Sequence, residues 1–235
     1  MRGKKVSVCI PTYECDGKSL FFITKLVSSV LNQTYENLEI VISDHSMNDV
    51  VHDYVKSLFT DKITYIKNYE NIGYPAFNTN NAIKNSQGDF IKIMNMDDYL
   101  DSSDTILKMV SMLDGDDSWV LSSFKHFNYE TNEMYRFMTP IIQGDGKHLL
   151  DGINLVGCPS VALIPKKEFF DTNVQYMIDC ELWYRLFHKY GQPRIHGEHD
   201  IVIGVGSHSL SSKIINQQQK LISEDIKYCH KKFSI

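Results

Sequence analysis

One stretch, Gly88–Leu100, constrains the fold more than any other. Its centre, Phe90–Met94, is compact and largely hydrophobic, as a strand buried inside a sheet would be. The run ends abruptly in Asn95, Asp97 and Asp98, and open α/β sheets bind ligands beyond the carboxyl ends of their strands. In an extended segment, Asn95 and Asp97 point to the same side, which suits a divalent cation that holds a diphosphate. The simpler alternative is a solvated Asp-Asp turn that caps the next helix.

The chain before this stretch alternates apolar strands with amphipathic helices. Val6–Ile10 is typical of a buried strand, and Pro11 is expected to end it in a turn, because proline cannot donate to a central ladder. Polar residues follow this strand and two later ones, which predicts a doubly wound α/β sheet with one crevice fed by three loops. The other expected elements are helices at 20–31 and near 50–58, strands at 38–42 and 63–66, and a turn-forming segment at 68–81 leading into a helix.

The pattern after Leu100 is looser, and residues 124–158 carry no motif. No linker, repeat or low-complexity tract divides the chain, so one domain is expected over residues 1–235. The periodicity predicts helices at 103–113, 181–189 and 216–233 and strands at 119–122, 161–164 and 201–205.

The last of these helices has an apolar face and a small cluster of lysines. Packing of that face on the body of the protein is expected. Contact with a membrane surface is the alternative, but Glu224 and Asp225 interrupt the basic cluster.

The composition excludes several classes of protein. A formal charge of −5 argues against a general nucleic-acid binder, because phosphate neutralisation needs a dominant basic face. The five cysteines are scattered and form no Cys-x-x-Cys pair, which is typical of reduced thiols rather than of a zinc site. The first apolar run spans only about five residues, too short for a signal peptide or a membrane span, so a cytoplasmic location is expected.

Four pieces of the chain, in this order, resemble glycosyltransferase family 2, whose members are inverting enzymes with a GT-A fold. They are VSVCIPTYE, LNQTYENLEIVISDHSMND, NIGYPAFNTNNAIKNSQGDFIKIMNMDD and DCELWYRL. The resemblance implies a Rossmann-like, mostly parallel central sheet flanked by helices, with a C-terminal acceptor-side region. It further implies a nucleotide-sugar-binding half at 1–98 and an acceptor-binding half at 99–235.

The resemblance also implies a nucleotide site. The loop Pro11-Thr12-Tyr13 would cradle the base and ribose, and Asp44 would accept a hydrogen bond from the nucleobase, usually uracil. The alternative for Asp44 is an N-cap. Asn71 and Gly73 resemble the segment that approaches the donor, but the arginine common there is missing, and Phe77-Asn78-Thr79 occupies its neighbourhood.

Asn95-Met96-Asp97-Asp98 is similar to the D-x-D-D metal motif of the family except at its first position. An amide carries no negative charge, although its carbonyl can coordinate a cation or bind the ribose. The resemblance therefore makes Asp97 the expected ligand of Mg²⁺ or Mn²⁺ and places Asn95 and Met96 beside the nucleotide. Asp98 is expected either to contact the sugar or to cap the next helix.

Asp179 is similar to the aspartate that precedes a helix in the family, and the resemblance implies that it is the general base. Ile178 replaces the glutamate that usually comes before this aspartate. The alternative for Asp179 is again an N-cap, and Glu181 is the second choice of base. His208 resembles a late histidine of the family that can approach the metal or the diphosphate, although a surface position is the simpler expectation.

These observations predict an inverting, metal-dependent transferase of hexosyl or N-acetylhexosaminyl type. The expected donor is a UDP-sugar, and the expected acceptor is a hydroxyl of a glycan or lipid-linked saccharide in surface polysaccharide biosynthesis. The enzyme would work in the cytoplasm, with peripheral contact at the inner face of the cell membrane as an additional expectation. A non-catalytic nucleotide-sugar-binding or scaffolding protein on the same fold is the alternative. A sugar-nucleotide pyrophosphorylase is disfavoured, because residues 9–18 offer only one glycine for a triphosphate loop.

Overall fold

The computed structural model describes residues 3–213 and 217–235 and contains one mixed sheet. Four strands form its parallel part, and an antiparallel strand, β8, joins them to the remaining strands. In spatial order the strands are β3 (Ile63–Lys67), β2 (Leu38–Asp44), β1 (Val6–Thr12), β4 (Phe90–Ile93), β8 (Ala162–Pro165), β6 (Val120–Asn128), β9 (Arg194–Val205) and β5 (Tyr99–Leu100), with β7 (Glu133–Met138) paired to β6.

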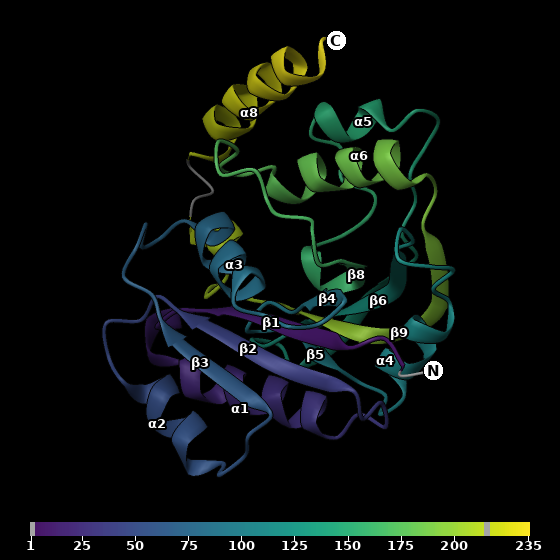
Figure 1. Ribbon diagram of the computed structural model, residues 1–235. Coiled ribbons are helices and arrows are strands. Elements are labelled where there is room, and N and C mark those ends of the chain that lie inside the picture. Colours follow the sequence, from purple (N-terminus) through teal and green to yellow (C-terminus); the bar gives the residue numbers. More distant parts are fainter. Residues whose placement is uncertain (1–2, 214–216) are drawn as a thin grey trace.

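The parallel part follows the predicted alternation of strands and helices. Helices α1 (Ser19–Leu31) and α2 (Val50–Ser57) cover one face of β1, β2 and β3, and α3 (Pro75–Lys84) covers the other face (Figure 1). Helix α3 begins at Pro75, whose fixed φ suits the first helical turn. Because β1 to β4 all run the same way, their carboxyl ends share one edge of the sheet.

The turn expected at Pro11 is wrong, because β1 continues through Pro11 to Thr12. Both residues pair with β2, where Pro11 lies opposite Ser43. The ladder between β1 and β4 stops at Cys9. Pro11 therefore lies beyond the β4 ladder, and its missing N–H leaves no partner unsatisfied on that side.

The second half of the chain adds the remaining strands on the other side of β4. The expected strands and helices are present, and β6, β9 and α6 are longer than the periodicity indicated. A short helix and β7 lie inside residues 124–158, where no motif announced them. The helices are α4 (Thr105–Ser111), α5 (Lys147–Leu150), α6 (Ile178–Tyr190), α7 (Leu210–Lys213) and α8 (Gln218–Phe233), and two 3-10 turns span Cys15–Gly17 and Pro159–Val161.

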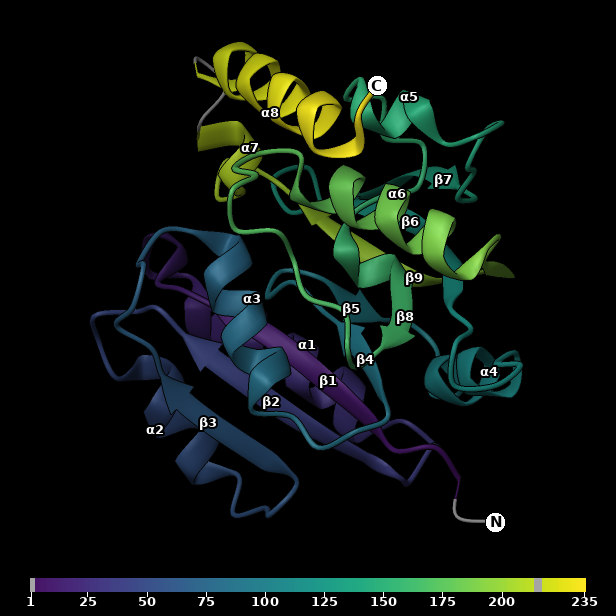
Figure 2. The same ribbon diagram turned by 45° about the horizontal axis from the view of Figure 1, so that its top comes forward.

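Helix α8 lies beside α5 and α6 in both views of the fold (Figures 1 and 2). Its apolar residue Cys229 is buried, and Ile222 and Ile226 pack against the core, so the expected packing on the body of the protein is confirmed. Asn216, the first residue of the predicted helix, lies outside the described residues. Among the helices that the structure describes, none is both long enough and apolar enough to span a bilayer.

Candidate active site

The ends of β1, β2 and β4 meet a segment that follows β9. Thr12 on β1 donates its hydroxyl to Asp44 on β2, with an Oγ1–Oδ1 distance of 2.9 Å. Tyr13, directly after β1, donates its hydroxyl to the carbonyl of His208 at 3.0 Å. His208 in turn lies beside Asp97, which follows β4. These contacts bring together five of the residues predicted from the sequence.

Asp44 is completely buried at the end of β2, and three protein groups donate hydrogen bonds to its carboxylate. The Thr12 hydroxyl and the Ser46 N–H donate to Oδ1, each at 2.9 Å, and the Tyr65 hydroxyl donates to Oδ2 at 2.7 Å. Burial alone would raise the pKa of Asp44, but these donors outweigh it and lower the pKa. Because helix α2 begins after Asp49, Asp44 is not an N-cap. These three donors leave about one acceptor position of the carboxylate, and Lys67 Nζ lies 3.6 Å from Oδ2, so a nucleobase N–H would have to reach a buried oxygen.

Asn78 occupies the neighbourhood of the missing arginine and joins the strand ends together. Its Nδ2 donates to the carbonyl of Thr12 at 3.0 Å, and its Oδ1 accepts from the Ser43 hydroxyl at 2.6 Å. The side chain is buried, so it supplies no positive charge at the surface of the site. Nearby, Asn71 and Gly73 adopt φ of 52° and 90°, a left-handed bend that glycine accepts without steric cost.

Residues 95–98 form a turn, so the extended arrangement expected for Asn95 and Asp97 is wrong. The Asp98 N–H donates to the Asn95 carbonyl at 3.1 Å, which closes the turn. The Asn95 side chain donates to Asp98 Oδ2 at 3.2 Å, and Met96 is buried. Asn95 and Asp97 therefore face different partners, and Asp97 alone points toward the segment after β9.

Asp97 and His208 form a close pair at the edge of the sheet. His208 Nε2 lies 3.0 Å from Asp97 Oδ2. The imidazole is only 2% exposed, so the expected surface position is wrong, whereas the Asp97 side chain is 20% exposed. The rings of Phe22 and Tyr129 flank the imidazole, with centroids 4.4 and 5.6 Å away, and hold it in place. The pair thus combines a fixed imidazole with a carboxylate that solvent can reach.

Asp98 is buried behind this pair and caps no helix, since Asp104 precedes α4. Its oxygens accept from the Gly204 N–H at 2.8 Å and from the Cys158 thiol at 3.6 Å. Burial and the neighbouring charge of Asp97 raise the pKa of Asp98 to about 8. Asp98 therefore links the turn at residues 95–98, which we call the metal-motif turn, to β9 and to Cys158. It does not face an open site.

Gly204 is needed where β9 passes the metal-motif turn. A Cβ at this position would lie 2.3 Å from the Asp97 carbonyl oxygen and 2.8 Å from the ring of Tyr129. No side chain fits in that space. The glycine therefore lets the backbone of β9 approach Asp97 and donate to Asp98.

Asp179 lies in the first turn of α6 and is not its N-cap, which is Met177. Its Oδ1 accepts from the Cys180 N–H and its Oδ2 from Asn154 Nδ2, each at 2.8 Å. Burial outweighs these two donors and raises the pKa of Asp179 to about 6. A carboxylate with this pKa is ionised at neutral pH and is basic enough to accept a proton.

Glu181, the second choice of base, lies in an ion-pair network. It is fully buried, and Arg185 Nε and Lys232 Nζ approach its Oε1 at 3.0 and 2.8 Å. Arg185 also binds Glu168 at 2.7 Å. Two cations thus hold the Glu181 carboxylate in a structural role, away from proton transfer.

A short turn, residues 154–158, connects Asp179 to Asp98. Asn154 at its start donates to Asp179, and Cys158 at its end donates to Asp98. The charges of both aspartates, together with burial, raise the pKa of the Cys158 thiol. The turn therefore brings the predicted base close to the metal-motif turn, although about 80 residues separate them in the sequence.

The Asp97–His208 pair fits a divalent cation. A carboxylate oxygen and an imidazole nitrogen are ligands that manganese and related metals accept, and the two atoms already lie 3.0 Å apart. Asn95 does not join them, because its side chain bonds to Asp98. The donor set available from this chain is thus Asp97 and His208.

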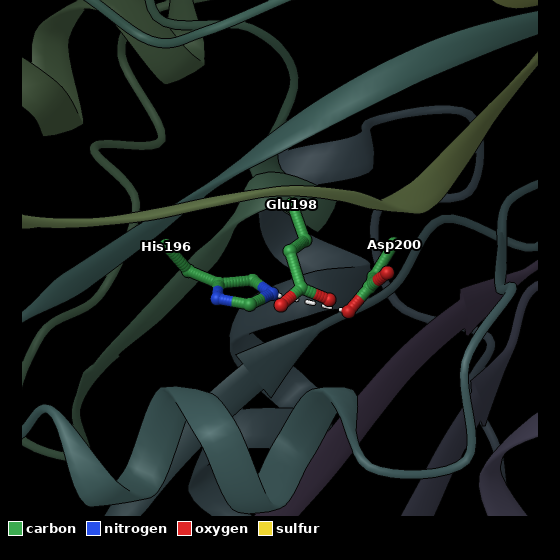
Figure 3. A group of neighbouring side chains, drawn as sticks. All are labelled: His196, Glu198 and Asp200. Atoms are coloured by element: carbon green, nitrogen blue, oxygen red, sulfur yellow. Dashed lines mark hydrogen bonds and ion pairs between the residues drawn. The ribbon is translucent and has the colours of Figure 1, made fainter.

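Among the described residues, one group of three metal-ligating side chains lies elsewhere, on β9. Figure 3 shows His196, Glu198 and Asp200 converging, with His196 Nε2 3.1 Å from Asp200 Oδ2. Lys108 Nζ from α4 lies 2.6 Å from Glu198 and 3.6 Å from Asp200. An ammonium already balances these carboxylates, so the group is explained as an ion-pair network between α4 and β9.

Sequence reasoning missed several residues of the site. Asn154 and Cys158 lie in the section without a motif, and Gly204, although it begins the segment that carries His208, was given no role. Ser46 is buried at the end of β2, and its Oγ has no hydrogen-bond partner within the described residues. The spacing Asp44-x-Ser46 was visible in the sequence, but nothing in it predicted an unpaired hydroxyl.

Comparison with known protein families adds independent evidence. The model of the family described as Glycosyl transferase family 2 matches residues 7–171, a range that includes Asp44, Asp97 and Asp98. An uncharacterized glycosyltransferase of Rickettsia typhi is 27% identical over 212 residues, 84% of this chain and 62% of that protein. The chain thus covers less than two thirds of this relative. The Escherichia coli UDP-Glc:alpha-D-GlcNAc-diphosphoundecaprenol beta-1,3-glucosyltransferase is 37% identical over 94 residues, 40% of this chain and 36% of that protein.

Two solved structures share the fold. S. aureus TarS 1–349 in complex with UDP has a TM-score of 0.62 at 18% identity, over 94% of this chain and 65% of that chain. The mannosyltransferase PcManGT from Pyrobaculum calidifontis, in complex with GDP-Man and Mn²⁺, has a TM-score of 0.61 at 16% identity, over 92% and 61% of the two chains. This likeness confirms the predicted GT-A fold.

Proposed function

The chain belongs to glycosyl transferase family 2, and we propose that it transfers a sugar from a nucleotide-diphosphate donor to a hydroxyl group of a glycan or lipid-linked saccharide. The observation that carries the proposal is the turn at 154–158, which joins Asp179 to the metal-motif turn. A proton acceptor and a site for a diphosphate thereby lie on either side of one short segment.

Asp179 is the proposed general base. It takes the proton of the acceptor hydroxyl while the acceptor oxygen forms a bond to the anomeric carbon. The bond from that carbon to the diphosphate oxygen breaks, and its electron pair leaves with the nucleoside diphosphate. Attack from the face opposite the diphosphate inverts the anomeric centre. The pKa of about 6 keeps Asp179 ionised at neutral pH, and Asn154 orients its carboxylate.

Asp97 and His208 are the proposed protein ligands of a Mn²⁺ or Mg²⁺ ion. When bound, such an ion neutralises the charge that develops on the departing diphosphate. Support comes from the 3.0 Å contact of the two side chains and from the Mn²⁺ in the PcManGT complex. Tyr13 fixes the backbone of His208 by donating to its carbonyl.

A UDP-sugar is the proposed donor, because TarS was solved with UDP and the E. coli relative is named for UDP-glucose. The same name specifies an acceptor linked to diphosphoundecaprenol. A lipid-linked acceptor of this kind, and surface polysaccharide as the product, are proposed for this chain too. Such an acceptor would require peripheral contact with the inner face of the cell membrane.

Calorimetric titration of UDP and GDP, with manganese or with a chelator, tests this proposal on the wild type and on Asp97→Ala. We expect UDP binding that depends on the metal and is lost in the variant. No binding of either nucleotide would contradict the donor-site assignment. Nucleotide binding without turnover on any acceptor, unaffected by loss of Asp179, would instead favour a non-catalytic binding protein on the same fold.

A further inference from the structure

Asp225 is a buried carboxylate on α8 that binds the backbone in front of α6. The side chain is only 3% exposed. Its oxygens accept the N–H groups of Gln175 at 3.0 Å, Tyr176 at 2.7 Å and Met177 at 2.9 Å. No lysine, arginine or histidine within the described residues forms an ion pair with it.

Of the three N–H groups that bind Asp225, only that of Met177, the N-cap, is one that α6 leaves unpaired, whereas Gln175 and Tyr176 precede the helix. The first N–H groups at a helix N-terminus have no partner inside the helix, and the helix dipole favours a negative charge there. Met177 is the N-cap of α6, and its own side chain makes no capping hydrogen bond. Asp225 therefore supplies, from another helix, an acceptor for the N-cap N–H and a negative charge in front of this N-terminus.

Two residues after Met177 lies Asp179, so the same contact fixes the position of the proposed base. The three N–H groups belong to consecutive residues, and their common acceptor sets the course of the backbone as it enters α6. An error of about 1 Å in the position of a reacting group can lower a rate about 100-fold. Asp225 thus acts on the base through the backbone and touches no reacting atom.

Further contacts from α8 hold the segments on both sides of Asp179. Lys232 Nζ lies 2.6 Å from Asp171 and 2.8 Å from Glu181, and the Tyr228 hydroxyl donates to Asp171 at 2.8 Å. His230 lies 2.9 Å from Asp151, three residues before the Asn154 that donates to Asp179. Helix α8 therefore contacts the chain before Asp179, after it and beside its hydrogen-bond partner.

We propose that α8 positions the general base and that Asp225 is its central positioning residue. The proposal rests on the proposed function, because it assumes that Asp179 accepts the proton. It also goes beyond the family match, since α8 lies outside residues 7–171.

The test compares Asp225→Asn, Asp179→Asn and the wild type. The matched control is Glu224→Gln, since Glu224 is the exposed neighbour of Asp225 on α8 and pairs only with Lys220 at 3.8 Å. UDP release from UDP-glucose is measured with N-acetylglucosamine-diphosphoundecaprenol as the acceptor probe, and amide hydrogen exchange is followed at residues 175–177. In Asp225→Asn we expect faster exchange and a kcat about 10- to 100-fold lower, with the KM for UDP-glucose within about twofold.

The control variant should match the wild type in kcat and in exchange. An unchanged kcat in Asp225→Asn, in spite of faster exchange at 175–177, would overturn the positioning role. Equal activity of Asp179→Asn and wild type would instead refute the base assignment, and thus the proposed function. If Asp225→Asn does not fold, Lys232→Gln decides between the outcomes. It leaves the backbone contacts of Asp225 in place, so a lower kcat at constant KM supports the role of α8, and an unchanged kcat contradicts it.

Discussion

Asp44 in the parallel half is fully buried and Asp179 in the second half is half-buried, and their environments shift their pKa values in opposite directions. Asp44 accepts from Thr12, Ser46 and Tyr65, and its pKa is lowered. Asp179 accepts from only Cys180 and Asn154, and burial raises its pKa to about 6. The balance between desolvation and hydrogen-bond donors therefore decides how a carboxylate titrates, because burial disfavours the ionised form and each donor stabilises it.

This comparison separates a structural aspartate from a reactive one. A carboxylate saturated by protein donors holds strand ends together and has little capacity left for a proton or a ligand. A carboxylate with few donors keeps an affinity for protons near neutral pH.

Asp179→Asn should lower kcat by about 10²- to 10⁴-fold, because general-base catalysis contributes that much and an amide cannot accept the proton. UDP affinity should stay within about twofold of the wild type, since the residue lies on the acceptor side of the proposed site. Steady-state kinetics and calorimetry measure the two quantities. Asp145→Asn, an exposed change in the same half, is the control. A kcat within threefold of the wild type would remove Asp179 from the mechanism.

His208→Ala should weaken the affinity for Mn²⁺ by at least about 10- to 100-fold, since that is the usual cost of losing an outer-shell partner and His208 is proposed as a ligand itself. The pair with Asp97 is the reason, because His208 Nε2 and Asp97 Oδ2 lie 3.0 Å apart. Titration of the metal in the presence of UDP gives the affinity. His199→Ala changes another histidine, on β9, and should leave the affinity for Mn²⁺ unchanged. Equal metal affinity in His208→Ala and in the wild type would show that the imidazole only packs.

Asp44→Asn should destabilise the fold by about 1–3 kcal/mol, because the new amide N–H₂ would face the donors of Thr12, Ser46 or Tyr65. Asp179→Asn should cost less stability, since the amide can keep the contact with the Cys180 N–H. Urea unfolding of both variants measures the difference. Asp53→Asn, an exposed change on α2, serves as the reference. Equal stability of all three variants would break the proposed contrast between the two environments.

The elements of the parallel half could be predicted well, because the patterns that mark them lie within short stretches of sequence. The apolar runs at Val6, Leu38 and Phe90 are each followed by polar residues, and parallel strands must bring those ends to one edge. The continuation of β1 through Pro11 was not predicted from the sequence. Proline is acceptable there because the ladder between β1 and β4 ends at Cys9, so no strand on that side needs an N–H from residue 11.

The connection of Asp179 to the rest of the site could not be predicted from the sequence. It depends on Asn154 and Cys158 in a turn without a motif, and on Asp225 in a helix that is about 45 residues further along the chain. The partner of Asn95 also escaped prediction, because a turn at 95–98 separates two side chains that an extended segment would align.

The pH dependence is the smallest effect and the sharpest test of the contrast. Only ionised Asp179 can take a proton, so kcat should fall about tenfold per pH unit below pH 6 and level off above it.

The stability of the fold should respond to pH in the opposite sense. The folded protein holds the Asp179 proton more tightly than the unfolded chain, so ionisation between pH 3.8 and about 6 lowers stability as pH rises. Asp44, with a lowered pKa, instead contributes stability above pH 3.8 that is lost on further acidification. Kinetic profiles and urea titrations at several pH values should therefore give an acid limb near pH 6 without a matching loss of stability. A parallel loss of both at pH 6 would mean that the limb reports unfolding and not the base.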